Sequence, residues 1–409
     1  MNPTFDCIIV GAGPGGSTAA TFAARAGLRV LLIDKDTFPR DKICGDAISG
    51  KSMSVIKRLG MTEALQQSTS LPSWGVTFSG PYGDQVAIPF TKELNKPVAP
   101  GYICRREFFD ALVFEQAQAS GATIWLQTTF TGFLQENGKL KGIKAKTADG
   151  TEKVAIAPLV IGADGAYSIV AKSLGIDQLN EAHYCGGLRV YYKGVTGFHP
   201  QNHVELHFVD EAVPGYFWIF PMPNGEANVG VGMLSSEIKN RKVKLKALLD
   251  LLIAHPRFKD RFANAEAISP VKGWGLPLGS QPRTMAGEGW MLLGDAASLI
   301  DPFTGEGIGN AMVSGEQAAL WAKKATDAGR YDANFLAGYE KEVLRILTDE
   351  LRLSHWMQRL TNWKWLLNTV IAKASRDPKI ADTISCMFDD HDQRKQLISP
   401  MFYLRLLMA

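Results

Sequence analysis

The sequence predicts a mixed α/β and α+β fold in which two domains are interleaved and a helical segment follows. Apolar runs at residues 5–11 (FDCIIVG) and 28–34 (LRVLLID) flank an Ala-rich stretch, and this order indicates a parallel β–α–β sheet. Runs at residues 203–210 (HVELHFVD) and 216–233 (YFWIFPMPNGEANVGVGM) indicate a second, β-rich region, in which Asn224-Gly225 predicts a hairpin turn. Because the two styles alternate along the chain, interleaved domains explain the sequence better than domains in series.

The domain boundaries follow from where the style of the sequence changes. After Gly305 nearly all of the sequence has a helical pattern. The expected ranges are 1–70, 98–180 and 270–330 for a Rossmann-like domain, 71–97 and 181–269 for the β-rich domain, and 331–409 for a helical C-terminal segment.

The composition excludes several classes of protein. The 409 residues include 44 Lys and Arg against 41 Asp and Glu, a net charge of +3 without a block of one sign, so nucleic acid is not an expected partner. No apolar stretch approaches the length of a membrane-spanning helix. We therefore expect a cytoplasmic protein, and contact with a membrane surface stays open.

Neither the cysteines nor the histidines form a recognisable cluster. An odd, dispersed set of cysteines argues against a disulfide framework and favours a reducing compartment. His203 and His207 are expected on the exposed face of a strand, and no metal site is expected. The five cysteines are Cys7, Cys44, Cys104, Cys185 and Cys386.

A first glycine motif, Gly11-x-Gly13-x-x-Gly16, lies between the first apolar strand and the Ala-rich helix. Its glycines suit a tight turn, close approach of a pyrophosphate, and helix–strand packing, while Asp34 ends the second strand and can bind ribose hydroxyls. The motif predicts a dinucleotide but does not distinguish FAD from NAD. Its candidate cofactor-binding residues are Gly11, Gly13, Pro14, Gly15, Gly16, Asp34 and Lys35.

Two further motifs follow later strands. The second, VIGADGAYS at residues 160–168, contributes Asp164 and Gly165, although taken alone it reads as an ordinary turn capped by Asp or Ser. The third combines WMLLGDAA at 290–297 with DPFTGEGIGNA at 301–311. Its strand delivers a carboxylate, and its loop opens a long helix whose free N–H groups suit the negative charge of a reduced flavin. The candidates in the third motif are Gly294, Asp295, Pro302, Gly305, Gly307 and Ile308.

Together the three motifs resemble the FAD fingerprints of the para-hydroxybenzoate hydroxylase-like flavoproteins. The resemblance implies FAD as cofactor, with Asp295 on the ribityl chain, and Arg105 (or Arg106) as the family arginine that opens a helix and contacts FAD. The second motif departs from the family, because Ala171-Lys172 follow Val170 where an Arg is usual. Both NAD(P)H and a reduced carrier protein therefore stay open as electron donors.

Three segments resemble the geranylgeranyl reductase family more narrowly. They are PRDKICGD at residues 39–46, YFWIFP at 216–221 with GVG at 230–232, and GWGLPLG at 273–279. They resemble the family's P-x-x-K-x-C-G loop and its YxWxFP…GxG motif, and the resemblance covers about residues 4–320. It implies that Cys44 and Gly45 lie at the cofactor, and that the substrate is an isoprenoid or another lipid.

The aromatic strand predicts one wall of the substrate site. Tyr216, Trp218 and Phe220 alternate, so they share one face. With Pro221 they would line an apolar site for a hydrocarbon or an aromatic ring; core packing is the alternative. Cys44 and Tyr216 are the catalytic candidates for delivering a proton, and Cys44 alternatively serves only the fit of its loop.

These observations support three functions in order. The first is an FAD-dependent oxidoreductase that reduces carbon–carbon double bonds of an isoprenoid or other lipid-like substrate by hydride from flavin N5. The second is an FAD-dependent monooxygenase of an aromatic or lipid substrate. The third is a flavin-dependent halogenase, whose WxWxIP signature is only half matched. The C-terminal segment, with Trp356, Trp363, Trp365 and FYLRLLM at 402–408, is expected to pack on the core or to contact a membrane.

Overall fold

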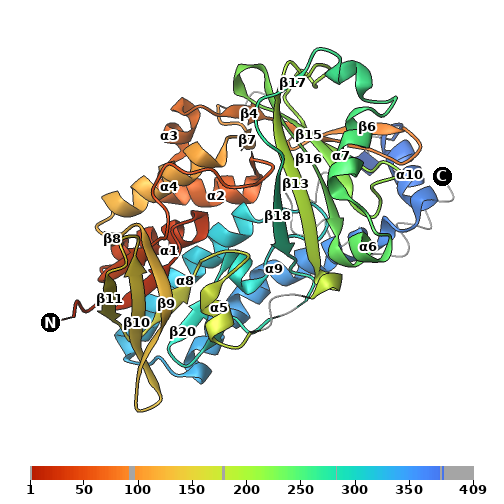
Figure 1. The fold of residues 1–409 in the computed structure, drawn as a ribbon. Coiled ribbons are helices and arrows are strands. Elements are labelled where there is room, and N and C mark those ends of the chain that lie inside the picture. Colours follow the sequence, from red (N-terminus) through yellow and green to blue (C-terminus); the bar gives the residue numbers. More distant parts are fainter. Residues whose placement is uncertain (1, 92–96, 177–179, 282, 378–379, 382–409) are drawn as a thin grey trace.

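The computed structural model describes residues 2–91, 97–176, 180–281, 283–377 and 380–381. The chain forms two regions that lie side by side (Figure 1). A helix-rich region built on a parallel sheet occupies the left of that view, and a large, mostly antiparallel sheet occupies the right. The chain crosses between the two regions several times, as the alternating style of the sequence predicted.

The helix-rich region contains a six-stranded sheet that is parallel except at one edge. Its central strands are short runs of fully buried, mostly aliphatic residues, as expected for a parallel sheet whose two faces are both covered. In spatial order the strands are β19 (Ala286–Gly287), β20 (Trp290–Leu292), β12 (Val160–Gly162), β1 (Cys7–Val10), β2 (Val30–Ile33) and β8 (Thr123–Trp125).

Helices pack around this sheet. Helix α1 (Pro14–Arg25) begins directly after β1 with Pro14 in its first turn, and it packs against α4 (Arg106–Ala119) and α8 (Ile308–Ala328). Helix α2 (Gly50–Leu59) packs on α8, followed by α3 (Thr62–Gln67). The short helix α5 (Ile169–Ser173) follows β12.

Two small sheets complete this region. One is antiparallel and consists of β9 (Thr128–Glu136), β10 (Lys139–Thr147) and β11 (Glu152–Ile156). A turn at Asp149-Gly150 joins β10 to β11, with Gly150 at φ 90°. The other consists of β3 (Ala47–Ile48), β7 (Gly101–Ile103) and β4 (Leu71–Ser73).

The large sheet brings together strands from distant parts of the chain. Strand β5 runs parallel to β14, so residues 75–89 join the later β-rich segment in one sheet. The predicted hairpin turn at Asn224-Gly225 joins β15 to β16, with φ values of 61° and 70°, as a type I′ turn requires. The strands are β17 (Glu266–Ala267), β13 (Tyr184–Lys193), β16 (Glu226–Leu234), β15 (Tyr216–Pro221), β14 (Val204–His207), β5 (Gly75–Ser79) and β6 (Gln85–Pro89), with β18 (Lys272–Pro277) also paired to β13.

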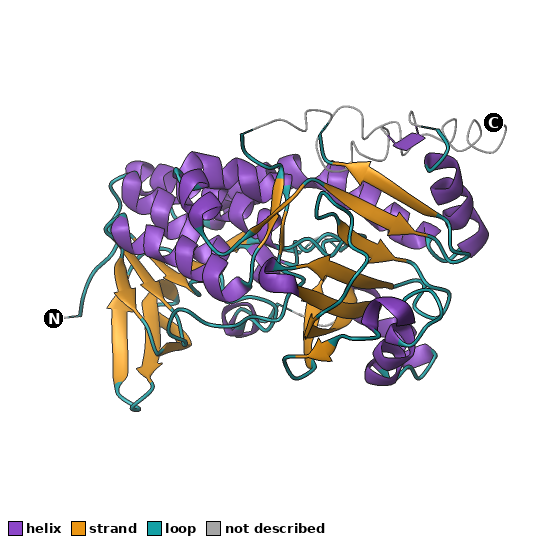
Figure 2. Ribbon diagram, turned by 90° about the horizontal axis from the view of Figure 1, so that it is seen from above, coloured by secondary structure: helices purple, strands orange, loops and turns teal. Residues whose placement is uncertain are grey.

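Helices flank this sheet on both sides (Figure 2). Helix α7 (Leu245–Ile253), which follows α6 (Ser235–Asn240), packs against β13 and β16, and α10 (Lys364–Ala374) packs against β5 and β6. The long helix α9 (Ala333–Leu360) joins the two regions. Leu347 belongs to the core of the parallel sheet, whereas Leu353 belongs to a core of the large sheet. The expected element at residues 402–408 lies outside the described residues.

The expectation that His203 and His207 are exposed was wrong. Both side chains are 1% exposed. The His207 ring packs against Phe258 in the segment that follows α7, with 4.7 Å between ring centres, and the His203 ring stacks on His199 at 3.6 Å. His207 shares hydrogen bonds with Ser79 and Glu205, and Glu205 pairs with Arg261.

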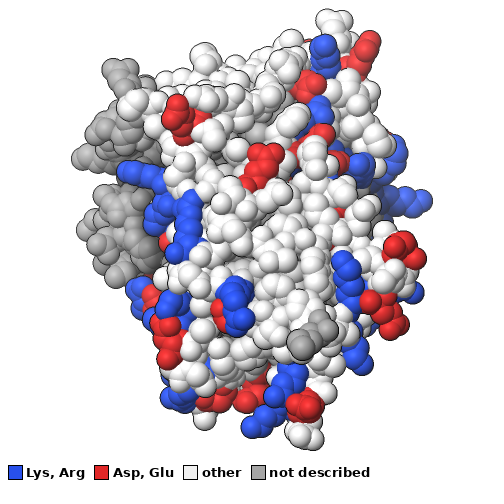
Figure 3. All heavy atoms as spheres, turned by 90° about the vertical axis from the view of Figure 1, so that its left-hand side faces the viewer, with Lys and Arg blue, Asp and Glu red and all other residues white. Residues whose placement is uncertain are grey.

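On the face drawn in Figure 3, basic and acidic side chains are intermixed. Within the described residues, no helix is long and apolar enough to cross a bilayer, and no group of three His, Cys, Asp or Glu side chains is arranged to hold a metal ion.

Candidate functional site

A cavity of about 530 Å³ lies between the parallel sheet and the large sheet. It opens at the carboxyl ends of β1, β2, β12 and β20, where ligands bind in open α/β sheets. All three glycine motifs and the aromatic strand β15 contribute to its lining. The structure therefore brings together segments that are far apart in the sequence.

The three glycines of the first motif have different surroundings. Gly11 has φ 103°, and a Cβ there would lie 2.5 Å from the Ala163 carbonyl oxygen. A Cβ at Gly16 would lie 1.8 Å from the Gly11 carbonyl oxygen, so this glycine packs α1 against the turn and does not line the cavity. Gly13 does line it, and the nearest atom to a Cβ there is an Arg40 nitrogen at 3.8 Å. The open side of Gly13 is where a pyrophosphate can approach the backbone.

Asp34 is held by backbone N–H groups at the end of β2. Its Oδ2 accepts a hydrogen bond from the Ala12 N–H at 2.6 Å, and its Oδ1 accepts one from the Asp36 N–H at 2.9 Å. Each carboxylate oxygen retains capacity for a further donor, so Asp34 is fixed in place and able to accept ribose hydroxyls. Lys35 lines the cavity beside it.

Asp164 of the second motif uses its carboxylate within its own turn. Oδ1 accepts a hydrogen bond from the Ser168 hydroxyl, and Oδ2 accepts from the N–H groups of Ile169 and Val170. Burial raises the pKa of Asp164, and these hydrogen bonds oppose the shift. Asp164 and Gly165 both line the cavity, but the carboxylate itself serves to cap α5.

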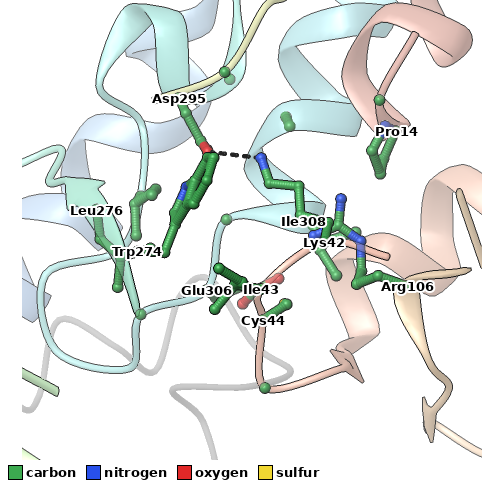
Figure 4. Close-up of a pocket in the computed structure, with 18 of the residues that line it drawn as sticks. Pro14, Lys42, Ile43, Cys44, Arg106, Trp274, Leu276, Asp295, Glu306 and Ile308 are labelled. Carbon is green, nitrogen blue, oxygen red and sulfur yellow. Dashed lines mark ion pairs between the residues drawn. The ribbon is translucent and has the colours of Figure 1, made fainter. Parts of the chain in front are cut away.

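Asp295 of the third motif faces a lysine across the cavity. Lys42 Nζ lies 3.7 Å from Asp295 Oδ2, and the two side chains point toward one another in Figure 4. Lys42 also lies 5.4 Å from the centre of the Trp274 ring. Burial lowers the pKa of Lys42, while Asp295 acts against that shift. Lys42 and Trp274 stood in the family-like segments, but sequence reasoning did not assign them to the site.

The loop of the third motif leads into the N-terminus of α8. Asp301 Oδ1 accepts hydrogen bonds from the N–H groups of Phe303 and Thr304, which shapes the loop. No described side chain caps α8 at Gly307. Gly307 and Ile308 line the cavity, together with Gly294, Pro302 and Gly305, so the positive end of the helix dipole faces the cavity.

Of the two adjacent arginines, the structure places Arg106 at the cavity and Arg105 away from it. Arg105 forms an ion pair with Glu226 at 2.5 Å and does not line the cavity. Arg106 is 5% exposed and forms two hydrogen bonds to Asp110. Although burial alone lowers its pKa, Asp110 and the neighbouring Cys44 outweigh burial and raise the pKa of Arg106. The expected cofactor contact therefore moves from Arg105 to Arg106, because only the side chain of the latter projects inward from the first turn of α4.

The aromatic wall has the arrangement that its alternation predicted. Tyr216, Trp218 and Phe220 line the cavity, whereas Phe217 and Ile219 pack on the opposite side of the sheet. The Tyr216 hydroxyl donates a hydrogen bond to the Thr304 carbonyl at 2.6 Å, and burial raises the pKa of Tyr216. Pro221 is buried but is not among the lining residues.

An apolar arm extends the cavity beyond this wall, and sequence reasoning missed it. Its side chains come from four separate segments of the chain. They are Ile48, Val76, Phe90, Val204 and Leu206. The available signal was the alternation of β14, which places Val204 and Leu206 opposite the polar residues at 203, 205 and 207.

The Cys44 loop lies between the cofactor motifs and the wall. Cys44 and Gly45 line the cavity, and a Cβ at Gly45 would lie 2.9 Å from the Phe220 ring. The Cys44 carbonyl accepts a hydrogen bond from Asn228 at 2.7 Å. The loop is thus tied to the large sheet at the point where cofactor and substrate would meet.

Comparison with known proteins identifies the family. Residues 4–354 match the family described as an FAD binding domain. A menaquinone reductase of Mycobacterium tuberculosis is 35% identical over 78% of this chain and 76% of its own. A digeranylgeranylglycerophospholipid reductase of Thermoplasma acidophilum is 32% identical over 87% of each chain. The chain belongs to the geranylgeranyl reductase family of FAD-dependent oxidoreductases.

Solved structures agree with this placement in the geranylgeranyl reductase family. A crystal structure of a geranylgeranyl bacteriochlorophyll reductase-like protein from Thermoplasma acidophilum has a TM-score of 0.76 at 27% identity, covering 100% of this chain and 96% of that chain. A flavin-dependent brominase has a TM-score of 0.77 at 20% identity, covering 99% and 98%, and this second likeness concerns the fold alone.

The residues of the cavity fit FAD. The open side of Gly13, the fixed carboxylate of Asp34 and the uncapped start of α8 offer sites for a pyrophosphate, a ribose and an electron-rich ring system. Asp295 adds a hydrogen-bond acceptor for the polyol chain that connects the ring system to the pyrophosphate. The family membership and the geometry therefore agree on the cofactor.

Proposed function

We propose that this geranylgeranyl reductase family member saturates carbon–carbon double bonds in the isoprenoid chain of a lipid. One observation carries the proposal: a single cavity connects the dinucleotide-binding motifs to the apolar arm. The names of the relatives support the substrate class, since menaquinone and geranylgeranyl lipids both carry isoprenoid chains. The named activity of either relative is thus a candidate for this chain.

The residues of the cavity divide into two groups by task. Gly13, Asp34, Asp295 and the start of α8 would hold FAD, which when bound and reduced supplies the hydride for the reaction. The face of β15 would place the isoprenoid chain by apolar contact, since Tyr216, Trp218 and Phe220 form a continuous aromatic surface.

Cys44 and Tyr216 remain the proposed groups beside the reacting bond. Cys44 adjoins Arg106, and Tyr216 is fixed by its hydrogen bond to Thr304. Their role would be to define where the double bond lies relative to the cofactor. The electron donor is either NAD(P)H or a reduced carrier protein, and chemical reduction by dithionite replaces both in the test.

The test is anaerobic reduction of the holoenzyme by dithionite, followed by addition of a geranylgeranyl lipid or of menaquinone. The expected result is reoxidation of the flavin spectrum together with a mass gain, located in the isoprenoid chain and not in the quinone ring, of two hydrogens per saturated bond. No mass gain with either lipid, combined with a long-lived C4a adduct on mixing reduced enzyme with oxygen, would favour the monooxygenase alternative.

A matched pair of variants tests the apolar arm. Leu206→Trp fills the arm and should reduce turnover of long-chain substrates by about 10-fold or more, because a buried site rejects added volume. Leu251→Trp places the same bulk on an exposed position of α7 and should leave turnover unchanged. Equal turnover in both variants would show that the chain does not enter the arm.

A further inference from the structure

Asp46 is a buried carboxyl group on the cavity lining. It ends the PRDKICGD segment, but no role has been assigned to it. Its side chain is fully buried, it follows Cys44 by two residues, and it lines the cavity. Its backbone has φ 67°, in the left-handed region that non-glycine residues rarely adopt. Its carbonyl accepts a hydrogen bond from the Cys104 N–H at 2.9 Å. A strained position that is held this firmly is typical of a functional site.

The hydrogen bonds around Asp46 establish which atoms are donors. The Trp218 indole N–H can only donate, and it donates to Asn228 Oδ1 at 2.9 Å. The amide nitrogen of Asn228 must then be the group that donates to the Cys44 carbonyl and to Asp46 Oδ2, at 2.7 and 2.8 Å. The Tyr191 hydroxyl also donates to Asp46 Oδ2, at 2.6 Å.

The two carboxyl oxygens of Asp46 are therefore unequal. Oδ2 accepts from two donors, whereas Oδ1 has no hydrogen-bond partner in the part of the chain that the structure describes. When the carboxyl group is neutral, its proton consequently resides on Oδ1. The donors at Oδ2 stabilise the carboxylate that remains after the proton leaves.

The surroundings of Asp46 favour a proton that is retained to higher pH than in an ordinary carboxyl group but can still be released. Burial raises the pKa of Asp46 to about 6, while Tyr191 and Asn228 oppose the shift. Arg189 and Arg106 also act on Asp46 to favour its charged form. Arg189 is 1% exposed and lies 4.0 Å from the centre of the Tyr191 ring. Tyr216, in contrast, already donates its proton to Thr304, and its pKa is raised further.

We propose that Asp46 is the general acid of the reaction and delivers the Oδ1 proton to the alkene carbon that does not receive the hydride. This inference rests on the proposed reduction of a double bond. The O–H bond of Asp46 breaks and one C–H bond forms, while the hydride from the reduced cofactor completes the second C–H bond. The substrate gains two electrons and two hydrogens, and the cofactor is oxidised by two electrons. Asp46 is left as a carboxylate that regains a proton from water that enters the cavity once the product has left.

The first test compares Asp46→Asn with Asp327→Asn in the FAD-loaded, dithionite-reduced enzyme. Asn preserves the shape and an acceptor for Tyr191 and Asn228 but has no acidic proton, so substrate reduction should fall by about 100-fold or more. FAD binding and reduction by dithionite should be unchanged. Asp327 lies in an exposed ion pair on α8, and its variant should retain wild-type rates. Retention of at least half the activity in Asp46→Asn, with loss in Cys44→Ala, would assign the proton to Cys44 and overturn the proposal.

A second readout does not depend on activity. Infrared difference spectra should contain the carbonyl band of a neutral carboxylic acid that disappears as pH rises through about 6, and Asp46→Asn should lack this band. Tyr191→Phe removes one donor from Oδ2, so the band should persist to higher pH and the alkaline limb of the pH–rate profile should move in the same direction. Cys104, Arg105, Arg106 and Arg189 also face this carboxyl group, so the Asn variant is needed to assign the band.

The outcomes separate this proposal from the proposed function. Absence of the carboxylic acid band at about pH 5 overturns the role of Asp46, whatever the substrate is. If the band is present but the wild-type enzyme saturates no isoprenoid lipid, the proposed function fails, and the role of Asp46 as acid in that reaction fails with it. A variant that does not fold is recognised by loss of FAD binding, and Tyr191→Phe then decides the question alone.

Discussion

Lys42 and Asp295 form an ion pair across the cavity, with 3.7 Å between Nζ and Oδ2 (Figure 4). Lys42 comes from the loop after β2, and Asp295 comes from the turn after β20. The pair therefore joins the PRDKICGD segment to the third glycine motif at the site of the cofactor.

Asp295→Ala should weaken FAD binding by about 10- to 100-fold, because it removes a hydrogen-bond acceptor and leaves the partly buried Lys42 ammonium without its partner. Titration of the apoprotein with FAD, followed by flavin fluorescence, measures the affinity. Asp327→Ala in an exposed ion pair serves as the control. Unchanged affinity in Asp295→Ala would refute the assignment of Asp295 to FAD.

Gly13→Ala should mainly weaken FAD binding, whereas Gly16→Ala should mainly lower the stability of the fold. A Cβ at Gly13 points into open cavity, so the variant should keep its melting temperature as apoprotein but lose about 10-fold or more in FAD affinity. A Cβ at Gly16 would overlap the Gly11 carbonyl, and overpacking of this kind costs about 1–3 kcal/mol or more of folding free energy. Thermal unfolding and FAD titration of both variants distinguish the two effects, and the same loss of stability in both would contradict the expectation.

His203 should make the stability of the apoprotein fall in mild acid. Burial lowers the pKa of His203 to about 4, and neighbouring His199 adds to the shift. Between that pH and the unfolded pKa of about 6.5, the unfolded chain binds the proton and the folded protein does not, so stability rises with pH in this window. Asp46, whose pKa is raised to about 6, acts in the opposite direction there.

The effect of His203 is isolated by comparison with His203→Gln. The free energy of unfolding of wild type relative to the variant should decrease by roughly 2–4 kcal/mol as pH falls from about 7 to about 4. Urea unfolding at several pH values measures it. Parallel pH profiles for the two proteins would rule out the depressed pKa.

The turn between β5 and β6 and the start of α10 should contact membranes. Tyr82, Trp363 and Trp365 are 65%, 59% and 55% exposed, and the Tyr82 N–H donates to Asn368 of α10, which holds the two segments together. Exposed aromatic rings beside basic residues favour the lipid–water interface. Flotation with vesicles of phosphatidylcholine and phosphatidylglycerol should show binding that falls about 10-fold in Trp363→Ser/Trp365→Ser.

The control for this surface is Leu320→Ser, which alters an exposed apolar residue on α8. It should bind vesicles as the wild type does. Equal binding by the double tryptophan variant and the control would place any membrane contact elsewhere.

Features that depend on neighbouring residues could be predicted from the sequence alone. The Gly11 to Gly16 turn, the Asn224-Gly225 hairpin and the shared face of Tyr216, Trp218 and Phe220 all follow from backbone preference and from the period of a strand. The order of the three motifs predicted the flavoprotein fold for the same reason, since each motif is a local strand-to-helix turn.

Features that depend on which elements pack together needed the tertiary structure. The pairing of β5 with β14 brings Val76 next to Val204 and Leu206 in the apolar arm. The rotation of α4 about its axis places Arg106, and not Arg105, at the cavity. The burial of His207 depends on Phe258, which follows it by some fifty residues in the chain and packs against its ring. Asp46 acquires Tyr191 and Asn228 only when the large sheet closes over the Cys44 loop. The sequence alone determined the cofactor and the chemistry of the family, because short motifs encode them, whereas the tertiary structure decided which buried groups meet at the substrate, because burial and charge pairing arise only from long-range contacts.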